Sequence, residues 1–431
     1  MPTTFLIEVD SLHKRPQATT GGGIFFVRLI GPSLLVARVH QLQDDIWQVN
    51  YTAHDPGLYV LQVVLEYSHN RWAGGATDWG NWKNFGWVLG PEGLYEGEHV
   101  PGSPFRVRVT EVGEPTTVMP ACDPMHIVPG RWVLCDGQGS GPVPFVSARW
   151  CWRTIGCRAL SLDAFDSDAL RECSRAVRFP MRLVMVGDSV MREQADALRP
   201  TLGHAMATNW SLAYVDFMTG VTSAIGMLEL EGKAKPQFRL CQQTLACTLL
   251  FNAGIHDAYM SMYGRLHFPG QYKSLPRFSL DDYEFRMASA REHLNGLFPT
   301  SLLIFRTVTA AWLRFGNLAF DFNKVDKKQT SSRFSAGVSR SHRQRFGEGR
   351  HVCHAMNDRS IPSFLSGRRY SVWGLIDGYG PTVGRPDDLR DATHPQADSF
   401  GPINAQLMEA TFLRACPKTL ERLRLRDQSR A

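Results

Sequence analysis

The sequence predicts two folded parts: an all-β sandwich over residues 1–112 and a three-layer α/β domain with a parallel sheet over residues 126–431, joined by a linker at 113–125. Three observations support this prediction. A chain of 431 residues exceeds the usual size of one domain. Its first quarter consists of short β-rich segments separated by Gly and Pro. The remainder alternates continuous apolar runs with helical patterns, which is typical of a parallel sheet covered on both faces.

The composition is that of a folded protein, with 43% hydrophobic and 20% charged residues. The net charge of +6 is mild, and the basic residues gather at 324–350 and 418–430 without a basic helix interleaved with aromatics. These properties disfavour a nucleic-acid partner. No run of about 18 apolar residues occurs, so the sequence predicts no membrane span. Residues 1–16 do not have the pattern of a signal peptide.

The N-terminal strands are predicted from alternation. Trp47, Val49 and Tyr51 alternate with polar residues, as expected of a half-buried strand, and no helical pattern intervenes before residue 112. Regularly spaced strands of this kind indicate a β-sandwich. The other predicted strands are 24–30, 34–39, 59–63 and 105–109.

Two blocks within this region resemble a known repeat. Residues 44–67 resemble the paired central strands of a filamin-type immunoglobulin-like repeat, and residues 99–109 resemble its closing strand. The resemblance implies an immunoglobulin-like sandwich that offers a strand edge to a protein partner. Residues 68–96 depart from the repeat as a long loop rich in Trp and Gly. They suit either stacking on carbohydrate or packing against the neighbouring domain.

In the second part, residues 183–186 form an apolar run that ends in Gly187, the pattern of a strand buried on both faces. A helix is predicted to follow at 190–198. Residues 281–298 have helical spacing, with Phe285, Met287, Ala290 and Leu294 predicted on one side. Further strands are predicted at 248–251 and 302–305, and a last helix at about 403–415.

The ends of these strands carry the candidate site residues, because ligands of open parallel sheets bind at the carboxyl ends of the strands. Gly187-Asp188-Ser189 is the sharpest of them. The glycine permits a tight turn, and Ser189 then begins a helix whose N–H groups point outward, where they can stabilise an oxyanion. Two further strand ends read Asn252-Ala253-Gly254 and Arg306-Thr307.

A serine hydroxyl needs a base that removes its proton. Asp391 and His394 supply that base: an Asp three residues before a His can orient the imidazole and stabilise its protonated form. Taken singly, Gly-Asp-Ser also suits a plain turn and Asp-x-x-His a capped loop. Their placement, one after a buried strand and the other before the last helix, favours a Ser189–Asp391–His394 triad.

These blocks resemble the SGNH (GDSL) hydrolase superfamily, and more closely its PC-esterase branch of trichome birefringence-like and neurexophilin-type proteins. The lead-in residues 130–132 and 148–152 and the block 183–194 carry the closer resemblance. The resemblance implies acyl chemistry on carbohydrates or glycoproteins. Where the superfamily has Gly-x-Asn-Asp, this sequence has Gly254-Ile255-His256-Asp257. Residues with oxyanion or substrate roles implied by position are Gly220, Asn252, Gly254, His256, Asp188 and Arg306. Of these, His256 equally suits a core histidine, and Arg306 suits either a carboxylate or phosphate of the substrate or a structural ion pair.

The nine cysteines include no C-x-x-C pair, so a structural zinc site is not predicted. Five of them fall between residues 122 and 173, and this crowding predicts disulfides formed in an oxidising compartment. The odd total leaves at least one thiol over. Together with the family resemblance, this favours the secretory pathway, the Golgi or the extracellular space, in tension with the missing signal peptide.

The predicted activity is that of a serine-dependent esterase or O-acetyltransferase that passes through an acyl-serine. Its substrates would be an acyl donor and a carbohydrate or glycoconjugate, and no metal or other cofactor is predicted. Two alternatives remain open: a non-catalytic adaptor that binds through the filamin-like sandwich, and a general GDSL lipid esterase. The first would show no serine-dependent labelling, and the second would prefer long-chain acyl esters to acetyl esters.

Overall fold

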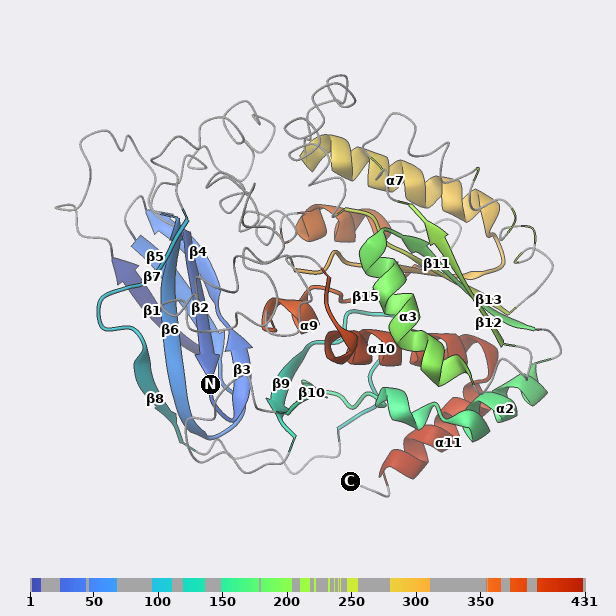
Figure 1. Cartoon of the computed structure of the whole chain (residues 1–431), viewed down its shortest axis with the longest axis horizontal. Coiled ribbons are helices and arrows are strands. Elements are labelled where there is room, and N and C mark those ends of the chain that lie inside the picture. Colours follow the sequence, from blue (N-terminus) through green and yellow to red (C-terminus); the bar gives the residue numbers. More distant parts are fainter. Residues whose placement is uncertain are drawn as a thin grey trace, which may run out of the picture.

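A parallel sheet of five strands forms the centre of the second part of the molecule (Figure 1). The strand order is β12-β11-β13-β14-β15, and every neighbouring pair is parallel. The predicted parallel sheet is therefore confirmed. Six of the seven residues of β11 are buried, as its apolar run predicts, and Arg182 is the exception. The strands are β11 (Met181–Gly187), β12 (Trp210–Asp216), β13 (Cys247–Phe251), β14 (Leu302–Arg306) and β15 (Gly374–Ile376).

The computed structural model describes most of both parts of the chain. Its described residues are 2–8, 24–43, 46–67, 95–110, 119–135, 149–177, 180–203, 210–217, 246–254, 280–310, 356–365, 373–385 and 394–428, with single residues at 221, 232, 236, 239, 241 and 354.

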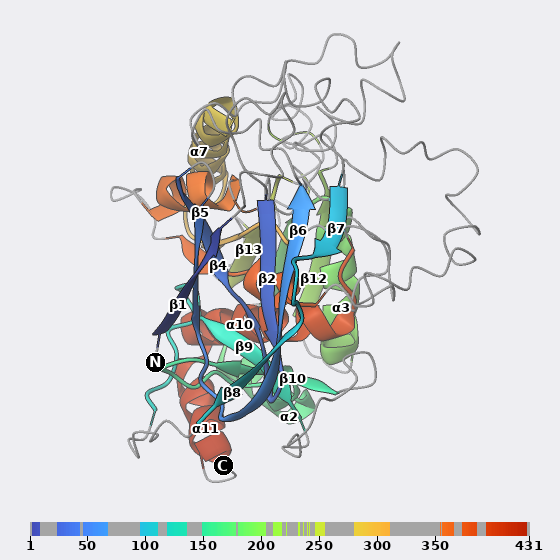
Figure 2. The same cartoon turned by 90° about the vertical axis from the view of Figure 1, so that its left-hand side faces the viewer.

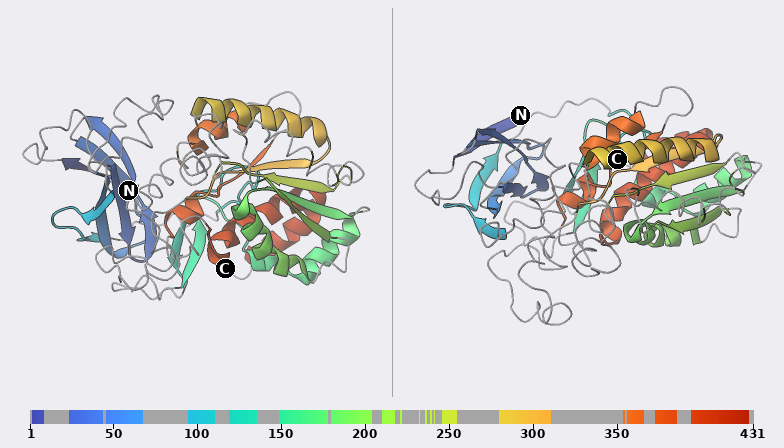
Figure 3. Two further views of the ribbon diagram at one scale, coloured as in Figure 1. Left: turned by 45° about the horizontal axis from the view of Figure 1, so that its top comes forward. Right: turned by 90° about the horizontal axis from the view of Figure 1, so that it is seen from above.

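Helices cover both faces of this sheet (Figure 3). Four of them share one hydrophobic core with one face of the sheet, while α7 (Leu280–Leu297) and helical residues 356–365 share a second core with the other face. The result is a three-layer α/β arrangement. The helices of the first core are α2 (Ser167–Ala176), α3 (Ser189–Gly203), α10 (Ala397–Ala415) and α11 (Pro417–Gln428). Two short elements complete this part, η4 (Leu162–Ala164) and α9 (Gly380–Val383).

Two predictions about helices need correction. The side chain of Phe285 is 70% exposed, because the buried face of α7 runs through Tyr283, Met287, Ala290 and Leu294 at spacings of four, three and four residues. The last helix was predicted at 403–415, but α10 begins at Ala397 and the further helix α11 follows it.

Two antiparallel sheets form the N-terminal part (Figure 2). They enclose a core that includes Trp47, Val49 and Tyr59, so the predicted alternation is confirmed for β5. The Tyr59 hydroxyl donates to the Asp55 carbonyl four residues upstream at 2.9 Å, an arrangement known from immunoglobulin-type sandwiches as a tyrosine corner. One sheet contains β1 (Pro2–Glu8), β5 (Ile46–Thr52) and β4 (Arg38–Gln43). The other contains β2 (Ile24–Ile30), β3 (Ser33–Val36), β6 (Gly57–Tyr67), β7 (Tyr95–His99) and β8 (Phe105–Val109).

A hairpin from the second part of the chain extends the second of these sheets. Strands β9 (Gly130–Leu134) and β10 (Trp150–Thr154) pair with each other, and β9 also pairs with β3 through Ser33 and Leu34. Strands from both sides of the predicted linker at 113–125 thus belong to one sheet. The linker and the domain boundaries remain a prediction.

Four disulfides join eight of the nine cysteines: Cys122–Cys157, Cys135–Cys151, Cys173–Cys416 and Cys241–Cys247. The remaining Cys353 lies outside the described residues. The disulfides predicted from the crowding of cysteines are thus present, and Cys173–Cys416 ties α2 to the end of α10.

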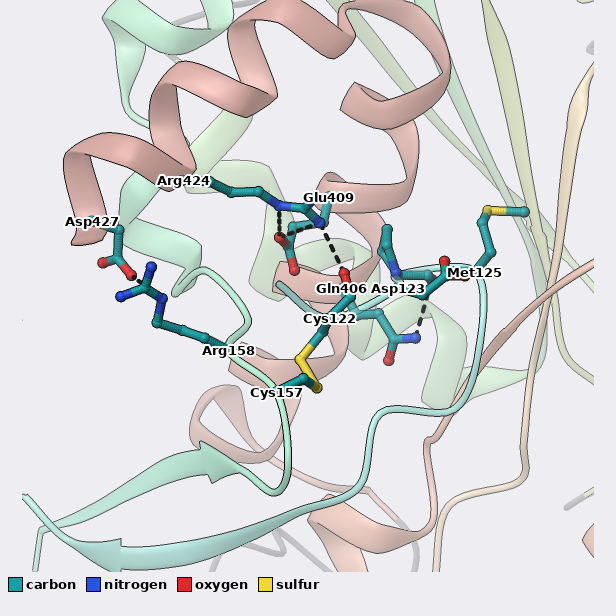
Figure 4. A network of polar contacts seen from close by, with 10 residues as sticks. Cys122, Asp123, Met125, Cys157, Arg158, Gln406, Glu409, Arg424 and Asp427 are labelled. Atoms are coloured by element: carbon teal, nitrogen blue, oxygen red, sulfur yellow. Dashed lines mark hydrogen bonds and ion pairs between the residues drawn. A yellow bond between two sulfur atoms is a disulfide. The ribbon is translucent and has the colours of Figure 1, made fainter. Parts of the chain in front are cut away.

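Residues 119–128 are fastened to the two C-terminal helices (Figure 4). Arg424 of α11 pairs with the buried Glu409 of α10 at 3.3 Å and donates to the Cys122 carbonyl at 2.9 Å. The amide of Gln406 donates to the carbonyls of Pro124 and His126. These contacts hold the start of the α/β part against the end of the chain.

No helix in the described part of the chain is long and apolar enough to cross a membrane.

Candidate active site

The site lies where the strand order of the parallel sheet reverses. The chain runs from β11 to β12 on one side and then returns to β13 on the other, and in such sheets ligands bind beside this switch point. Ser189 is the first residue of α3 and follows β11 directly after Gly187 and Asp188. Asn252 follows the neighbouring β13. The first two strand ends predicted from the sequence are therefore neighbours at this edge of the sheet.

Glycine is required at position 187 by the close approach of the chain. A Cβ atom there would lie 2.8 Å from Cβ of Met191 and 3.0 Å from the Asn252 carbonyl oxygen. The backbone also closes across the turn, since Asn252 N donates to Val186 O at 3.0 Å. The end of β13 thus packs directly on the turn that presents Ser189.

Ser189 and His394 meet although 205 residues separate them. Nε2 of His394 lies 2.7 Å from Oγ of Ser189. Ser189 is buried, with 8% of its surface exposed, and His394 is half-buried. When the imidazole proton is on Nδ1, Nε2 accepts the hydrogen bond from the serine hydroxyl and is placed to take its proton. This is the arrangement that nucleophilic catalysis by serine requires.

Asp188 and Tyr214 hold this turn from within. Oδ1 of Asp188, which is 2% exposed, accepts a hydrogen bond from Val190 N at 2.9 Å and so caps the start of α3. The Tyr214 hydroxyl on β12 lies 2.9 Å from the Asp188 carbonyl oxygen and 3.1 Å from that of Gly187. Burial raises the pKa of Tyr214, helped by the nearby carboxylates of Asp216 and Asp188, so this hydroxyl stays protonated and able to donate.

Asn252 and Arg306 continue the row of polar groups along the sheet edge. Nδ2 of Asn252 donates to the Arg306 carbonyl at 2.9 Å, which links the ends of β13 and β14. The second Nδ2 hydrogen of Asn252 would therefore make the predicted hydrogen bond to an oxyanion.

The Arg306 guanidinium is fully buried, and its three nitrogens have no hydrogen-bond partner in the part of the chain that the structure describes. Burial lowers the pKa of Arg306 to about 10, and the charge of Asp188 opposes that shift. Oδ2 of Asp188 is likewise buried, without a hydrogen bond to any described residue. The charges of Arg306 and Asp188 attract each other, and both alternatives for Arg306, an ion pair within the protein and a contact with substrate, remain predictions.

Packing and backbone conformation require a glycine at position 254. Its φ is +150°, and a Cβ atom there would lie 2.4 Å from Cγ2 of Val308, so glycine is required whatever its role toward a substrate. Beyond it, Asp377 accepts hydrogen bonds from the Thr307 hydroxyl, Tyr379 N and Gly380 N. Burial raises the pKa of Asp377, although these donors oppose the shift. This network closes the turn after β15.

Three predicted site residues lie outside the described residues: Asp391, Gly220 and His256. Their roles remain predictions. Among the residues that the structure does describe, no group of three or more His, Cys, Asp or Glu side chains is arranged to hold a metal ion.

Tyr214 is a residue of the site that was not predicted from the sequence. A signal was available, because Tyr214 and Asp216 stand at the end of β12, and an inspection of every strand end would have included them. The contact between Trp132 and Arg385, whose ring centroid and guanidinium carbon lie 4.8 Å apart, was also not predicted. Nothing in the sequence indicates that contact, since 253 positions separate the two residues.

The fold and site define a class: an α/β chain with a parallel sheet and a Ser–His pair at its switch point. No protein-family model matches the chain, and no curated protein matches it. Among solved structures it is similar to a crystal structure from Parabacteroides merdae ATCC 43184, described as a candidate GDSL-like lipase. The TM-score is 0.30 and the identity 10%, over 55% of this chain and 98% of that one. A likeness of this extent supports no conclusion about the reaction of this chain.

Proposed function

We propose that this chain is a serine-dependent acyl-transfer enzyme, an esterase or O-acetyltransferase that forms an acyl-serine at Ser189. The observation that supports the proposal best is the 2.7 Å contact between Nε2 of His394 and Oγ of Ser189 at the switch point of the sheet. A chance contact would not be expected to fall at the one place where such sheets bind ligands.

The reaction follows from this geometry. His394 takes the hydroxyl proton as Ser189 Oγ attacks the carbonyl carbon of an ester, giving a tetrahedral oxyanion. The main-chain N–H of Ser189, at the start of α3, would stabilise the oxyanion, with Asn252 or Gly220 as the second donor. When the C–O bond of the ester breaks, His394 returns the proton to the leaving alcohol. Water or a sugar hydroxyl, deprotonated in turn by His394, then releases the acyl group from Ser189.

Asp391 completes the proposal as the residue that orients His394. Its place three residues before the histidine suits a carboxylate that accepts the imidazole Nδ1–H and stabilises the imidazolium formed during attack. Asp391→Asn should therefore impair the reaction with little change in the substrate concentration needed for half-maximal rate.

The substrate class rests on the resemblance of residues 130–132, 148–152 and 183–194 to the PC-esterase branch. That resemblance favours acetyl groups on carbohydrates or glycoproteins. The four disulfides support folding in an oxidising compartment, which suits such substrates. We also propose that the N-terminal sandwich is filamin-type, supported by its two antiparallel sheets and its tyrosine corner at Tyr59.

Labelling with a fluorophosphonate probe tests the proposal. The wild-type protein and Ser289→Ala, which removes an exposed hydroxyl on α7, should be labelled, whereas Ser189→Ala should not. His394→Gln should label far more slowly. Labelling that persists in Ser189→Ala, or that is absent from the wild-type protein, would refute the proposal.

Two further measurements define the reaction: the acyl chain length that the enzyme prefers, and the acceptor that receives the acyl group. Acetyl esters of p-nitrophenol should be cleaved faster than long-chain esters, and a preference for long chains would favour a lipid esterase instead. Addition of a series of sugar acceptors, with products followed by mass spectrometry, would separate transfer to a hydroxyl from hydrolysis.

A further inference from the structure

The segment 380–385, which leads toward His394, lies against the N-terminal sandwich and its added hairpin (Figure 1). Short helix α9 contacts β9, and the chain leaves α9 through Gly384 and Arg385 before reaching His394. Ser189, by contrast, stands on β11 and α3. His394 stands just before α10, which packs on α3 in the α/β core, and segment 380–385 adds contacts with the sandwich to that support.

The hairpin is firmly joined to the sandwich. Leu34 of β3 pairs with Trp132 of β9, and the two side chains share one small hydrophobic cluster. Arg131 beside Trp132 makes two hydrogen bonds to the Asp55 carboxylate, at 2.6 and 2.7 Å. Burial opposes ionisation of Asp55, but these hydrogen bonds from Arg131 hold its pKa below the ordinary value, so the pair is charged. The position of Trp132 is thus fixed to that of the sandwich.

Trp132 in turn holds the chain that precedes His394. Its indole N–H donates to the Pro381 carbonyl of α9 at 2.9 Å. The guanidinium of Arg385, a side chain only 4% exposed, lies over the Trp132 ring at 4.8 Å from its centroid. A cation on an aromatic face away from water is a favourable contact that depends on direction and distance.

Arg385 also contacts a residue that follows His394 in the sequence. One of its terminal nitrogens lies 3.7 Å from Asp398 in the first turn of α10. In the sequence His394 lies between Arg385 and Asp398, and Arg385 contacts both Asp398 and the Trp132 ring. Asp398 is four residues from His394, so this contact links the start of α10 to the hairpin of the N-terminal sheet.

The neighbouring Gly384 gives independent support. Its φ of −87° and ψ of −15° suit any residue, so the backbone does not require glycine. A Cβ atom at this position would lie 3.0 Å from Cδ2 of Leu34 and 3.8 Å from Cγ2 of Val36, both on β3. The chain at Gly384 thus passes close against β3, and a larger side chain there would have to displace Leu34.

We propose that the N-terminal sandwich positions the general base: through Leu34, Trp132 and Arg385 it holds His394 at hydrogen-bond distance from Ser189. Arg385 is a positioning residue in this arrangement and touches no reacting atom. The inference rests on the proposed function for its catalytic consequence. It also assigns the sandwich a role in the reaction, beyond any partner that it binds.

Arg385→Met tests the contact, because methionine keeps much of the length of the side chain without the charge. Its kcat for p-nitrophenyl acetate should fall about 10- to 100-fold with KM little changed, as expected when a catalytic group is displaced by about 1 Å. Arg385→Lys should recover only part of the rate, since a lysine keeps the charge but not the planar fork. Arg424→Met is the matched control. It breaks a comparable ion pair with the buried Glu409 and should leave kcat of the folded protein near the wild-type value.

A second pair of variants tests the sandwich itself. Gly384→Val places a larger side chain toward Leu34 and should reduce kcat. Leu34→Ala should also reduce kcat, because it removes the contact with Trp132. The two losses should not add in the double variant, since the smaller alanine leaves space for the valine. Additive losses, or a wild-type kcat in both single variants, would overturn the proposal.

Amide hydrogen exchange gives a measurement that needs no activity. Exchange in the first turn of α10, residues 397–400, should be faster in Arg385→Met than in the wild-type protein and unchanged in Arg424→Met. If the wild-type protein shows no Ser189-dependent labelling, the proposed function fails. The exchange data then test by themselves whether Arg385 positions the start of α10. Wild-type exchange and turnover in Arg385→Met, or equal losses in both arginine variants, would overturn the inference.

Discussion

The two halves of the candidate site are built in different ways. Ser189 is held by residues close to it in sequence and by the adjoining strands: Gly187 closes the turn, Asp188 caps the helix, and Tyr214 reaches in from β12. The chain around His394 is instead held by Arg385, whose partner Trp132 lies on a hairpin of the N-terminal sheet. The half around Ser189 lies in the α/β core, whereas the half around His394 adds contacts with the N-terminal sheet to those that α10 makes with α3.

This difference indicates where each half is vulnerable. A substitution at the nucleophile turn should disturb the sheet core and lower stability together with activity. A substitution among the contacts around His394 should lower activity with a smaller cost in stability, because His394 and Asp398 are partly exposed to water. Variants in each half, and in the C-terminal helices outside both, can test that contrast.

The largest effect is expected from removing either reacting group. Ser189→Ala and His394→Ala should each reduce kcat by about 10⁴- to 10⁶-fold, and the double variant should be no worse, because the two groups act as one unit. Single-turnover hydrolysis of p-nitrophenyl acetate measures this. Additive losses in the double variant would show that the two residues act separately and would contradict the shared role.

Gly187→Ala should damage both stability and activity. The added methyl group would meet Met191 and the Asn252 carbonyl, and overpacking of this kind costs about 1–3 kcal/mol in the free energy of unfolding. Urea denaturation gives the stability, and fluorophosphonate labelling gives the activity. Gly203→Ala, at the end of the same helix, is the control: a Cβ there has no atom within 4 Å, so no loss is expected. Full labelling of Gly187→Ala would show that the turn accepts a methyl group and would contradict the close packing at Gly187.

The strand, turn and helix around Ser189 were predicted from the sequence, for a physical reason. The run of buried residues in β11, the glycine turn and Ser189 are consecutive, so local patterns contain the information. The same is true of Met287, Ala290 and Leu294 in α7, although the exposed Phe285 shows that an apolar residue does not by itself define the buried face.

The remainder depends on contacts between distant residues. The pairing of β9 with β3, and the arginine that lies on Trp132, are set by the way the two parts of the chain fold together. The pairing of cysteines is another case: crowding of Cys122, Cys151 and Cys157 indicated disulfides, but not that Cys173 joins Cys416 from 243 residues away. Periodicity along the chain contains no information about such distances.

Tyr214→Phe should have a moderate effect that is confined to the nucleophile half. The lost hydroxyl donates to carbonyl oxygens of Gly187 and Asp188, and one such hydrogen bond contributes about 1 kcal/mol, which corresponds to roughly a fivefold change in rate. The expected result is a small fall in kcat with KM unchanged, measured with p-nitrophenyl acetate. Tyr51→Phe, in the sandwich, should leave kcat as it is. A larger loss in Tyr51→Phe than in Tyr214→Phe would contradict the support assigned to Tyr214.

The smallest effect on chemistry is expected at Glu409, whose contacts fasten residues 119–128 to α10 and α11 (Figure 4). Burial raises the pKa of Glu409 to about 7, although Arg424 opposes the shift. The folded chain therefore binds a proton here more tightly than the unfolded chain, in which a glutamate titrates near about 4.3. The stabilisation from this proton is fully present below about pH 4.3 and is lost as the pH rises through about 7.

Glu409→Gln removes this titration while keeping the shape of the side chain. The free energy of unfolding of the wild-type protein, measured relative to that of the variant by urea denaturation, should fall by an amount on the order of a few kcal/mol between pH 5 and pH 8. Glu421→Gln, exposed on α11, is the matched control and should leave the wild-type slope unchanged. At a fixed pH, the rate of fluorophosphonate labelling at Ser189 should be the same in all three proteins. A parallel pH dependence in wild type and Glu409→Gln would contradict the raised pKa. Slower labelling in Glu409→Gln would show instead that His394 depends on the C-terminal helices as well as on the sandwich.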